Sequence, residues 1–269
     1  MIDSDFIEET LKIAEQLADA AWSAIEPHWR NLSGVENKQD GHGYDPVTAA
    51  DKNAEIAMRE VLTGARPQDG IRGEEFGEKP SKSGWTWVLD PVDGTRAFVA
   101  GLPVWTTLIG FCSADGDPLI GLIDQPVLGE RYLGWPGGAA LKHGDQSEAI
   151  QVSDCEDLRR AIIATTDPFI LTPPEQGAWT HLRSTARIIR YGLDAYAYAR
   201  LAAGSIDLVA EAGLAPHDMA ALIPIVRGAG GLACDWRGNA ANIDNGQLVC
   251  ASSEGVLEQA LISLRRSAI

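Results

Sequence analysis

The sequence predicts an α/β protein, and three features of the chain carry this prediction. Apolar residues between Ile7 and Ile25 recur every three or four positions, as in an amphipathic helix, and Pro27 ends that pattern. Short apolar runs then predict strands at 85–90, 106–112, 119–124 and 131–135. After about residue 150, short buried strands alternate with helical runs, which is typical of layered α/β structure.

The remaining elements follow from local patterns. Thr48 can cap a helix that runs to about Leu62, and residues 31–47 are polar and glycine-rich, which favours a loop or hairpin that could act as a lid. In the second half we expect strands at 162–165, 188–191, 208–211, 231–234 and 248–250. Helices are expected at 195–203, 219–227 and 254–265. Pro224 should kink the second of these helices.

Composition limits the classes of function. The chain has 269 residues, a formal net charge of −16 and a pI near 4.6, which argues against nucleic acid as a partner. No apolar run is long enough to span a membrane, and no signal peptide is evident. Four cysteines without CxxC spacing predict buried free thiols and a reducing cytoplasm: Cys112, Cys155, Cys234 and Cys250.

The most informative stretch is Asp90-Pro91-Val92-Asp93-Gly94-Thr95, which follows a predicted strand. Two carboxylates this close repel each other unless a cation lies between them, and Mg²⁺ prefers oxygen ligands of this kind. Gly94 permits a tight turn, and a helix that began after it would offer backbone N–H groups to an anion. Cations and an anion site on one turn suggest phosphate chemistry.

Other acidic residues could join this turn, although spacing alone does not bring them there. Asp51 could be only a first-turn residue of its helix, and Glu74 and Glu75 could form a solvated acidic turn. Asp218 could be an N-cap of the helical run that follows it.

These motifs together resemble the inositol monophosphatase superfamily of metal-dependent phosphatases. The resemblance is carried by Glu74-Glu75, by the Asp90–Thr95 motif, and by His217-Asp218 followed by Gly228–Gly231. Further stretches are similar to the histidinol-phosphate phosphatase branch: Asp45–Asp51, Gly73–Gly77, Ile123–Val127 and Asp194–Tyr198.

The resemblance implies the fold and the activity. The fold would be a layered α-β-α-β-α sandwich of the inositol monophosphatase and fructose bisphosphatase type. Residues 1–149 would carry most metal ligands, and residues 150–269 would carry the rest of the site. The activity would be Mg²⁺-dependent hydrolysis of histidinol phosphate in histidine biosynthesis, by a cytoplasmic homodimer.

The resemblance also implies metal ligands. Glu74, Asp90 and the backbone carbonyl of Val92 would hold a first Mg²⁺. Asp90, Asp93 and Asp218 would hold a second, and Glu74 a third, weaker ion.

Four further residues would act on the water and the phosphate. Thr95, supported by Asp51, would orient and deprotonate the attacking water, and the amides of Gly94 and Thr95 would bind phosphate. Lys38 falls where the family often has a lysine near the site, although it could equally be an ordinary loop residue.

The substrate would be selected by two other carboxylates. Asp194 could pair with the ammonium group of histidinol phosphate, or could only cap the helix that follows it. Glu211 stands seven residues before Asp218, where the superfamily has a glutamate that contacts the leaving alcohol. His217 is expected to pack or to orient its neighbour rather than to catalyse. Four tryptophans are expected to be core and interface residues rather than ligands: Trp85, Trp87, Trp105 and Trp135.

Other functions stay open. A close relative acting on inositol 1-phosphate or another small sugar phosphate is the first alternative. A bisphosphate-nucleotide phosphatase is disfavoured because the chain lacks a basic cluster for a second phosphate. A non-catalytic binding protein would not need all the acidic residues of the motifs.

Overall fold

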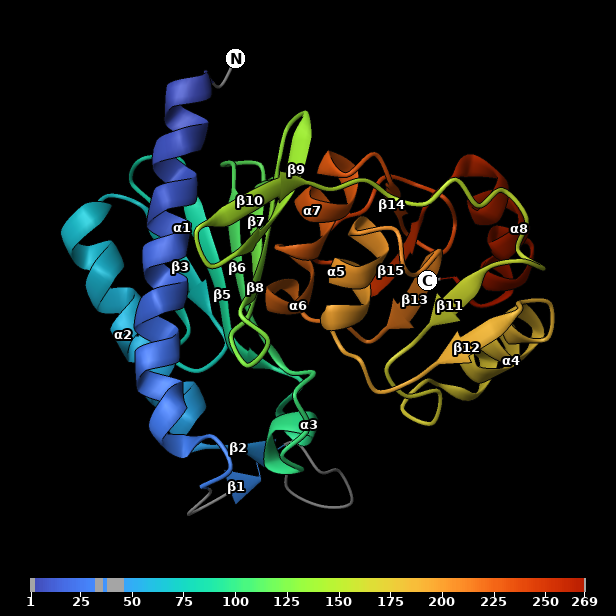
Figure 1. Ribbon diagram of the computed structural model, residues 1–269, viewed down its shortest axis with the longest axis horizontal. Helices are drawn as coiled ribbons and strands as arrows, with labels where there is room; N and C mark the ends of the chain where they lie inside the picture. Colours follow the sequence, from blue (N-terminus) through green and yellow to red (C-terminus); the bar gives the residue numbers. More distant parts are fainter. Residues whose placement is uncertain (1–2, 32–35, 38–45, 269) are drawn as a thin grey trace.

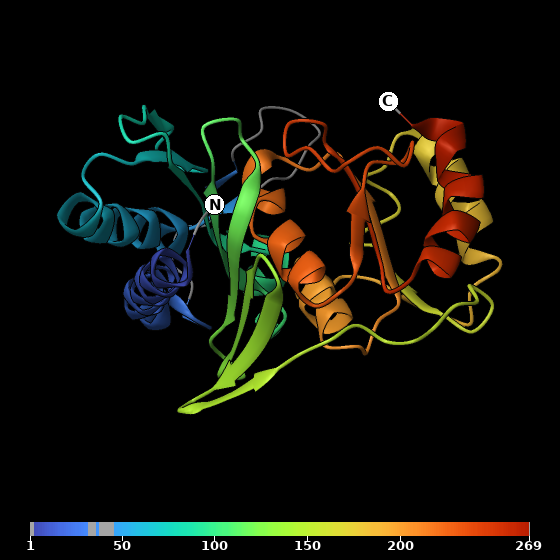
Figure 2. The same cartoon turned by 90° about the horizontal axis from the view of Figure 1, so that it is seen from above.

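The computed structural model describes residues 3–31, 36–37 and 46–268, and it confirms the layered sandwich (Figure 1). Two helices cover one face of an eight-stranded sheet, and three helices lie between that sheet and a five-stranded one. Two more helices cover the outer face of the second sheet, as the view from above also shows (Figure 2).

The first layer consists of α1 (Ser4–Ile25) and α2 (Ala49–Ala65). Asp3 caps α1 by accepting a hydrogen bond of 2.9 Å from the N–H of Phe6. Pro27 lies in the short 3₁₀ turn Glu26–His28 that ends the helix, as predicted. The strands β1 (Glu36–Asn37) and β2 (Pro46–Val47) pair in antiparallel fashion, in agreement with a hairpin.

The first sheet has the strand order β10-β9-β8-β7-β6-β5-β3-β4. Its strands are β3 (Gly70–Gly73), β4 (Glu78–Lys79), β5 (Thr86–Asp93), β6 (Thr106–Cys112), β7 (Pro118–Gln125), β8 (Glu130–Trp135), β9 (Gly138–His143) and β10 (Gln146–Ala149). The short helix α3 (Thr95–Val99) follows β5. Neighbouring strands are antiparallel apart from β3 and β5, which run parallel.

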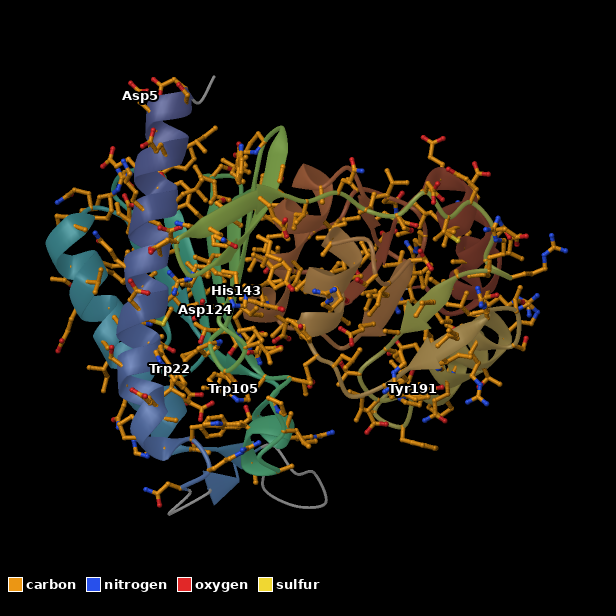
Figure 3. The ribbon with its side chains drawn as sticks, viewed as in Figure 1. Asp5, Trp22, Trp105, Asp124, His143 and Tyr191 are labelled. Atoms are coloured by element: carbon orange, nitrogen blue, oxygen red, sulfur yellow. The ribbon has the colours of Figure 1, made fainter. Side chains whose placement is uncertain are left out.

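The tryptophans fill the core between this sheet and α1. Trp87 and Trp105 are fully buried, and Trp105 stacks at 6.3 Å on Trp22 of α1 (Figure 3). Trp85 and Trp135 are half-buried and pack against the same cluster. The expected core role of these side chains is confirmed.

The second half of the sandwich is built from residues beyond 160. Its sheet has the order β12-β11-β13-β15-β14, with β11 (Ile162–Ala164), β12 (Ile188–Arg190), β13 (Leu208–Ala212), β14 (Leu232–Cys234) and β15 (Gln247–Ala251). The middle helices are α5 (Tyr196–Ala202), α6 (Pro216–Met219) and α7 (Leu222–Gly228). The outer helices are α4 (Pro173–Arg183) and α8 (Glu254–Leu264).

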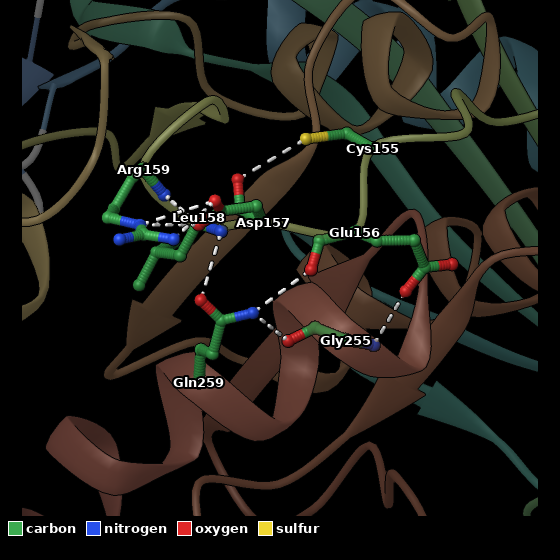
Figure 4. Close-up of polar contacts among 7 residues, drawn as sticks. All are labelled: Cys155, Glu156, Asp157, Leu158, Arg159, Gly255 and Gln259. Atoms are coloured by element: carbon green, nitrogen blue, oxygen red, sulfur yellow. Dashed lines mark hydrogen bonds and ion pairs between the residues drawn. The ribbon is translucent and has the colours of Figure 1, made fainter.

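The segment that leads into the second sheet is tied to α8 (Figure 4). The side chain of Gln259 accepts a hydrogen bond from the N–H of Leu158 at 3.2 Å and donates one to the carbonyl of Glu156 at 3.0 Å. The N–H of Gly255 donates to the carboxylate of Glu156 at 3.1 Å. These contacts hold the connection between the two sheets against the outer layer.

Several elements differ from the prediction. The helix expected at 219–227 is confirmed over 222–227 as α7, but its start is wrong, because a break at Ala220 and Ala221 separates α7 from α6. Pro224 does not kink a helix, because it lies in the first turn of α7. The N–H groups of a first turn make no hydrogen bonds within the helix, so a proline there removes none. The sequence patterns also missed β3, β4, β9, β10 and α4. All four residues of β10 are exposed, so this strand has no apolar alternation to detect.

Among the cysteines, Cys112, Cys234 and Cys250 are buried free thiols as expected, whereas Cys155 is only half-buried. Over the described part of the chain, none of the helices is both long enough and apolar enough to cross a bilayer.

A row of glycines sets the distance between the first sheet and the middle helices. Gly110, Gly121 and Gly134 face one another across β6, β7 and β8. A Cβ on Gly121 would lie 2.1 Å from the carbonyl oxygen of Ala221, and a Cβ on Gly134 would lie 2.2 Å from the Cα of Ile225. Since no side chain fits between them, the backbone around α6 and α7 lies directly against the sheet.

Substitution of Gly121 by alanine should therefore destabilise the protein. We expect Gly121→Ala to lower the free energy of unfolding by about 1–3 kcal/mol, because the added methyl group overlaps backbone atoms that cannot move aside freely. Urea unfolding of the two proteins measures this difference.

Gly64→Ala is the matched control for this prediction. Gly64 is exposed near the end of α2, and no heavy atom lies within 4 Å of the position a Cβ would take. Alanine there should leave stability unchanged or raise it by up to about 1 kcal/mol. Equal stability of Gly121→Ala and the wild type would show that the sheet and helices can separate without cost.

Candidate metal and phosphate site

A β-bulge brings the two carboxylates of the Asp90–Thr95 motif to one side of the sheet. Residues three apart in a regular strand point to opposite faces. Between Asp90, which pairs with Leu108, and Asp93, which pairs with Thr106, β5 contains one residue more than β6. That extra residue reverses the alternation, so Asp90 and Asp93 share a face. Pro91 is tolerated here because a bulge does not need its N–H.

The turn after the bulge is fixed by Gly94 and Thr95. Gly94 has a φ of 79°, in the left-handed region that favours glycine, and its carbonyl accepts hydrogen bonds from Ala97 and Phe98. The hydroxyl of Thr95 donates to the carbonyl of Val92 at 3.0 Å. The segment after Gly94 is helical, as the motif analysis expected, although α3 is only five residues long.

Parallel pairing places Glu74 beside Asp90. Gly73 at the end of β3 pairs with Leu89 of β5, and the N–H of Glu74 donates to the carbonyl of Leu89 at 3.2 Å. The residues that follow Gly73 and Leu89 are Glu74 and Asp90, so the two carboxylates emerge at the same edge. A freely solvated acidic turn, the alternative for Glu74 and Glu75, does not describe these half-buried residues.

Glu55 of α2 holds the loop that carries Glu74, and the sequence patterns did not single it out. Its fully buried carboxylate accepts hydrogen bonds from the N–H groups of Glu75 at 2.7 Å and Phe76 at 3.2 Å. Arg59 pairs with it at 2.7 Å. A Cβ on Gly73 would lie 2.0 Å from this carboxylate, so glycine is required for the close approach.

Asp218 reaches the site from α6. It is the third residue of that helix rather than its N-cap, and its carboxylate accepts a hydrogen bond of 2.6 Å from the N–H of Ala215. One ligand atom from each of Asp90, Asp93 and Asp218 lies within 4.8 Å of the others. A second group within the same limit joins Glu74 and Asp90 to His217. The two groups share Asp90.

Asp51 is not among the residues that line the cleft described below, and only 1% of its surface is exposed. One of its carboxylate oxygens accepts hydrogen bonds from the N–H of Thr48 at 2.8 Å and its hydroxyl at 2.6 Å, which caps α2. The other oxygen is buried and has no hydrogen-bond partner among the described residues. A first-turn residue of a helix needs no such orphaned acceptor, so this oxygen is available to another group.

The electrostatics of the cluster fit divalent cations. Burial, followed by the charges of Glu74, Asp93 and Asp218, raises the pKa of Asp90 well above its ordinary value. Burial and then the charges of Asp194 and Asp218 do the same to the pKa of Asp93. Burial also raises the pKa of Asp51 to about 6. Carboxylates forced together in this way gain most from a bound cation with oxygen preference such as Mg²⁺.

Asp194 lies against the Gly94 turn in a strained conformation. Its φ is 47°, and a Cβ on Gly94 would lie 3.0 Å from its carboxylate oxygen. The interpretation of Asp194 as a helix cap is wrong, because α5 has Ala195 as its N-cap and no side-chain cap. Burial raises the pKa of Asp194 to about 6, while the nearby Arg96 lowers it.

Glu211 projects from β13 and is almost fully buried. One of its oxygens accepts hydrogen bonds from the N–H and hydroxyl of Thr166, and the other accepts one from the hydroxyl of Tyr198 at 3.0 Å. Burial raises its pKa to about 7 in spite of these donors.

A single cleft collects these residues from both halves of the sandwich. The predicted residues that line it are Glu74, Asp90, Val92, Asp93, Gly94, Thr95, Asp194, Glu211 and Asp218. Lining residues that the motifs did not single out include Arg96, Thr166 and Asp167. Lys38 lies outside the described residues, as does most of the predicted lid at 31–47.

Comparison with known proteins identifies the family. The sequence profile of the inositol monophosphatase family matches residues 7–269, which is nearly the whole chain. The chain belongs to the inositol monophosphatase family. It is accordingly a phosphatase that acts on small phosphate esters, and members of this family are generally metal-dependent. The resemblance drawn from the motifs is thus confirmed at the level of the family.

The relatives within the family carry more than one name. The chain is 38% identical over 262 residues to the bifunctional phosphatase IMPL2 of Arabidopsis thaliana, covering 94% of this chain and 74% of the relative. It is 34% identical to a histidinol-phosphatase of Chlorobaculum parvum, covering 90% and 92% of the two chains. The solved structure of an inositol monophosphatase from Zymomonas mobilis aligns with a TM-score of 0.85 at 37% identity, covering 96% and 98%.

The contacts of Glu55 predict that it controls metal affinity. Glu55→Gln loses the charge that pairs with Arg59 and one of the two acceptors for the loop, so Glu74 should be held less firmly. We expect the Mg²⁺ concentration for half-maximal activity to rise about tenfold, with the rate at saturating Mg²⁺ much less affected. A loss of maximal rate at unchanged Mg²⁺ dependence would contradict this positioning role.

The raised pKa values also predict how Mg²⁺ affects stability at different pH. Because the pKa values of Asp194 and Glu211 are raised by folding, the folded protein binds more protons than the unfolded chain. The stabilisation that this proton binding provides is complete when the pH is below the ordinary pKa values, 3.8 for Asp194 and 4.5 for Glu211. This contribution is lost as the pH rises through the folded values, about 6 and about 7. Bound Mg²⁺ should offset the loss by compensating the negative charge.

The increase in melting temperature caused by saturating Mg²⁺ should therefore be larger at about pH 8 than at about pH 5. Calorimetry at each pH measures the melting temperature with saturating Mg²⁺ and after a chelator has removed divalent cations. The chelated sample is the reference. An increase of the same size at both pH values would mean that these carboxyls do not titrate with metal binding.

Proposed function

We propose that the protein is a Mg²⁺-dependent histidinol-phosphatase, which releases L-histidinol and phosphate. The observation that carries this proposal is the shared cleft: two ligand groups meet at Asp90, and the half-buried carboxylate of Asp194 lies against the adjacent Gly94 turn. The first feature suits hydrolysis of a phosphate ester, and the second suits a substrate with an ammonium group.

The proposed metal ligands are those that the family resemblance implies. Asp90, Asp93 and Asp218, which form one of the two groups, would hold one Mg²⁺. Glu74, Asp90 and the carbonyl of Val92, which line the same cleft, would hold another. A further, weaker ion would use Glu74. When bound, the ions would neutralise the phosphate, lower the pKa of the attacking water and stabilise the departing oxygen.

The chain's own groups would bind and orient the reactants. The amides of Gly94 and Thr95 would hold the phosphate at the start of α3. Thr95 would orient the attacking water, and the proton of that water would pass by way of the Thr95 hydroxyl to the carboxylate of Asp51. One oxygen of this carboxylate is buried and has no hydrogen-bond partner among the described residues. Most of the rate enhancement would come from positioning and electrostatics, and no phosphoenzyme is implied.

The alcohol side of the substrate would contact the second half of the sandwich. We propose that Asp194 pairs with the ammonium group and that Glu211 contacts the leaving alcohol. The histidinol-phosphatase from Chlorobaculum parvum, at 34% identity over almost all of both chains, supports this substrate. We also expect a cytoplasmic homodimer that does not bind nucleic acid.

The main alternative substrate is inositol 1-phosphate or another small sugar phosphate. It is favoured by the Zymomonas mobilis structure, which is that of an inositol monophosphatase and aligns over 96% of this chain. Both alternatives use the same metal and phosphate groups and differ only in the alcohol.

Phosphate release with Mg²⁺ tests the proposal directly. The substrates to compare are histidinol phosphate, inositol 1-phosphate, fructose 1,6-bisphosphate and an adenosine bisphosphate, and the quantity is kcat/KM. A strong preference for histidinol phosphate supports the proposal, and a preference for another ester moves the protein to a different branch. Asp93→Asn, which should fold normally and lose turnover, shows that release depends on this site. No release from any ester would favour a binding protein.

The role of Asp194 makes a more specific prediction. Asn is the suitable replacement because it tolerates the positive φ of 47° and differs mainly in charge. We expect Asp194→Asn to lower kcat/KM for histidinol phosphate about tenfold or more, or about 1.4 kcal/mol of transition-state binding, because an ion pair is lost.

For inositol 1-phosphate, which has no ammonium group, the same substitution should change kcat/KM by less than about threefold. Equal losses on both substrates would remove Asp194 from the basis of specificity, even if histidinol phosphate remained the preferred ester.

A further inference from the structure

A second pocket opens directly beside the metal and phosphate cleft. The two share four lining residues: Arg96, Thr166, Asp167 and Asp194. The pocket has a volume of about 500 Å³, compared with about 250 Å³ for the cleft. None of the proposed metal ligands lines this pocket. A ligand held in the cleft can therefore extend past Asp194 into a larger space that the phosphate and the metals do not use.

The residues that line only this pocket are mostly apolar. They include Leu102 in the loop after α3, Phe169 in the segment after β11, and Tyr191 directly after β12 (Figure 3). Phe169 is 85% exposed and Leu102 is 53% exposed. Large apolar side chains that face water beside a cleft gain free energy when a ligand covers them, so this surface suits an apolar group.

Contacts within the chain hold two of these wall residues in place. The ring of Tyr191 packs edge-on against the buried Trp179 at 6.2 Å, and its hydroxyl accepts a hydrogen bond of 3.3 Å from Arg183. The N–H of Phe169 donates to the carboxylate of Asp167 at 2.9 Å, which fixes the turn that carries this phenyl ring. Little of the wall therefore has to be ordered when a ligand binds.

The charges that line the pocket balance one another. Arg96 and Arg183 contribute two positive charges, and Asp167 and Asp194 contribute two negative ones. Arg96 pairs with Asp167 at 3.8 Å. Guanidinium groups stack on flat aromatic rings, whereas the hydroxyl groups of a polyol would lose hydrogen bonds to water against apolar walls. The pocket therefore favours a flat ring without a strong net charge.

Asp194 stands where the cleft and the pocket join, because it lines both. Its carboxylate lies against the Gly94 turn, where the phosphate is proposed to bind. With a phosphate at that turn and an ammonium group at Asp194, the third arm of a branched amino alcohol would point into the pocket. Inositol 1-phosphate has no such arm.

We propose that this pocket is a ring subsite, lined by Leu102, Phe169 and Tyr191, which binds an aromatic ring on the alcohol half of the ester. The inference rests on the proposed function, in that a phosphate and an ammonium group occupy the cleft. It extends that function to a wider substrate class, the phosphate esters of 2-amino alcohols that carry a flat aromatic ring. Because the walls contact the faces of a ring and not its nitrogen atoms, phenyl should serve as well as imidazole.

Phosphate esters that differ only in the ring test this subsite. Histidinol phosphate carries imidazole, phenylalaninol phosphate carries phenyl, and 2-aminopropyl phosphate is the same amino alcohol without a ring. Each is hydrolysed in the same way: water adds to phosphorus, the bond from phosphorus to the alcohol oxygen breaks, and the alcohol leaves with a proton from that water. Phosphate release by the full-length protein with Mg²⁺ gives kcat/KM for each ester.

We expect kcat/KM for the two ring-bearing esters to differ by less than about tenfold. Both values should exceed that of the ringless ester by about tenfold or more, because only a ring covers the apolar walls.

Substitutions of Phe169 locate the effect in the pocket. Phe169→Ala removes much of one wall, and Phe169→Leu keeps an apolar side chain there; the high exposure of this residue means that neither should disturb the fold. Phe169→Ala should lower kcat/KM about fivefold or more for both ring-bearing esters and less than about twofold for the ringless one, and Phe169→Leu should lose less. Ile262→Ala is the matched control, because Ile262 is 64% exposed on α8 in the outer layer and should not affect any of the three esters.

Three results would overturn the ring subsite. Ring-bearing esters that are no better than the ringless one would show that the ring makes no favourable contact. A phenyl ester more than about tenfold poorer than histidinol phosphate would show that the imidazole nitrogens are recognised instead. Equal losses on all three esters in Phe169→Ala, with a smaller sedimentation coefficient, would identify the surface as a contact between two copies of the chain.

A failure of the proposed function gives a different result. That function is tested by comparing histidinol phosphate with inositol 1-phosphate, and a preference for inositol 1-phosphate would reject it. The ratio between ring-bearing and ringless esters, and its response to Phe169→Ala, would still report on the pocket.

Discussion

The close approach of the first sheet to the backbone of α6 and α7 is the constraint on which the site depends. Glycines at 110, 121 and 134 form a row across three strands, and a side chain at any of them would overlap atoms of residues 220–225. Asp218 stands two residues before this contact, and β5 with its bulge is the strand next to β6. Candidate metal ligands from the two halves of the sandwich therefore meet because the sheet carries no side chains where the helices cross it.

That geometry works against the stability of the metal-free protein. The bulge turns Asp90 and Asp93 toward the same side, the parallel pairing of β3 and β5 adds Glu74, and α6 adds Asp218. Burial and mutual repulsion raise the pKa of Asp90 and Asp93, so each carboxylate makes the others harder to ionise. A divalent cation removes both costs at once, which explains how a chain with a net charge of −16 can attract an anionic ester.

The sequence predicted the parts of this arrangement that are local. The Asp90–Thr95 motif carries its own proline, glycine and carboxylates, and the helix after Thr48 has a cap that can be recognised in the sequence. Strand β10 was missed because its exposed residues have no apolar period, and the break between α6 and α7 was missed because two alanines give no turn signal. The glycine row was also beyond prediction, since it depends on strand register, which the sequence does not state.

Helix α2 shows how a spacing that is visible in the sequence acquires meaning only in the fold. Asp51, Glu55 and Arg59 stand four apart and share one face of the helix. In isolation this is an ordinary charged face, but here Asp51 and Glu55 are buried. Asp51 closes the helix cap and leaves one buried oxygen without a partner among the described residues, while Glu55 and Arg59 fix the loop that carries Glu74. One helix thus carries Asp51 and also anchors the loop of Glu74, so the two residues proposed to act on the water and the metal are held by the same element.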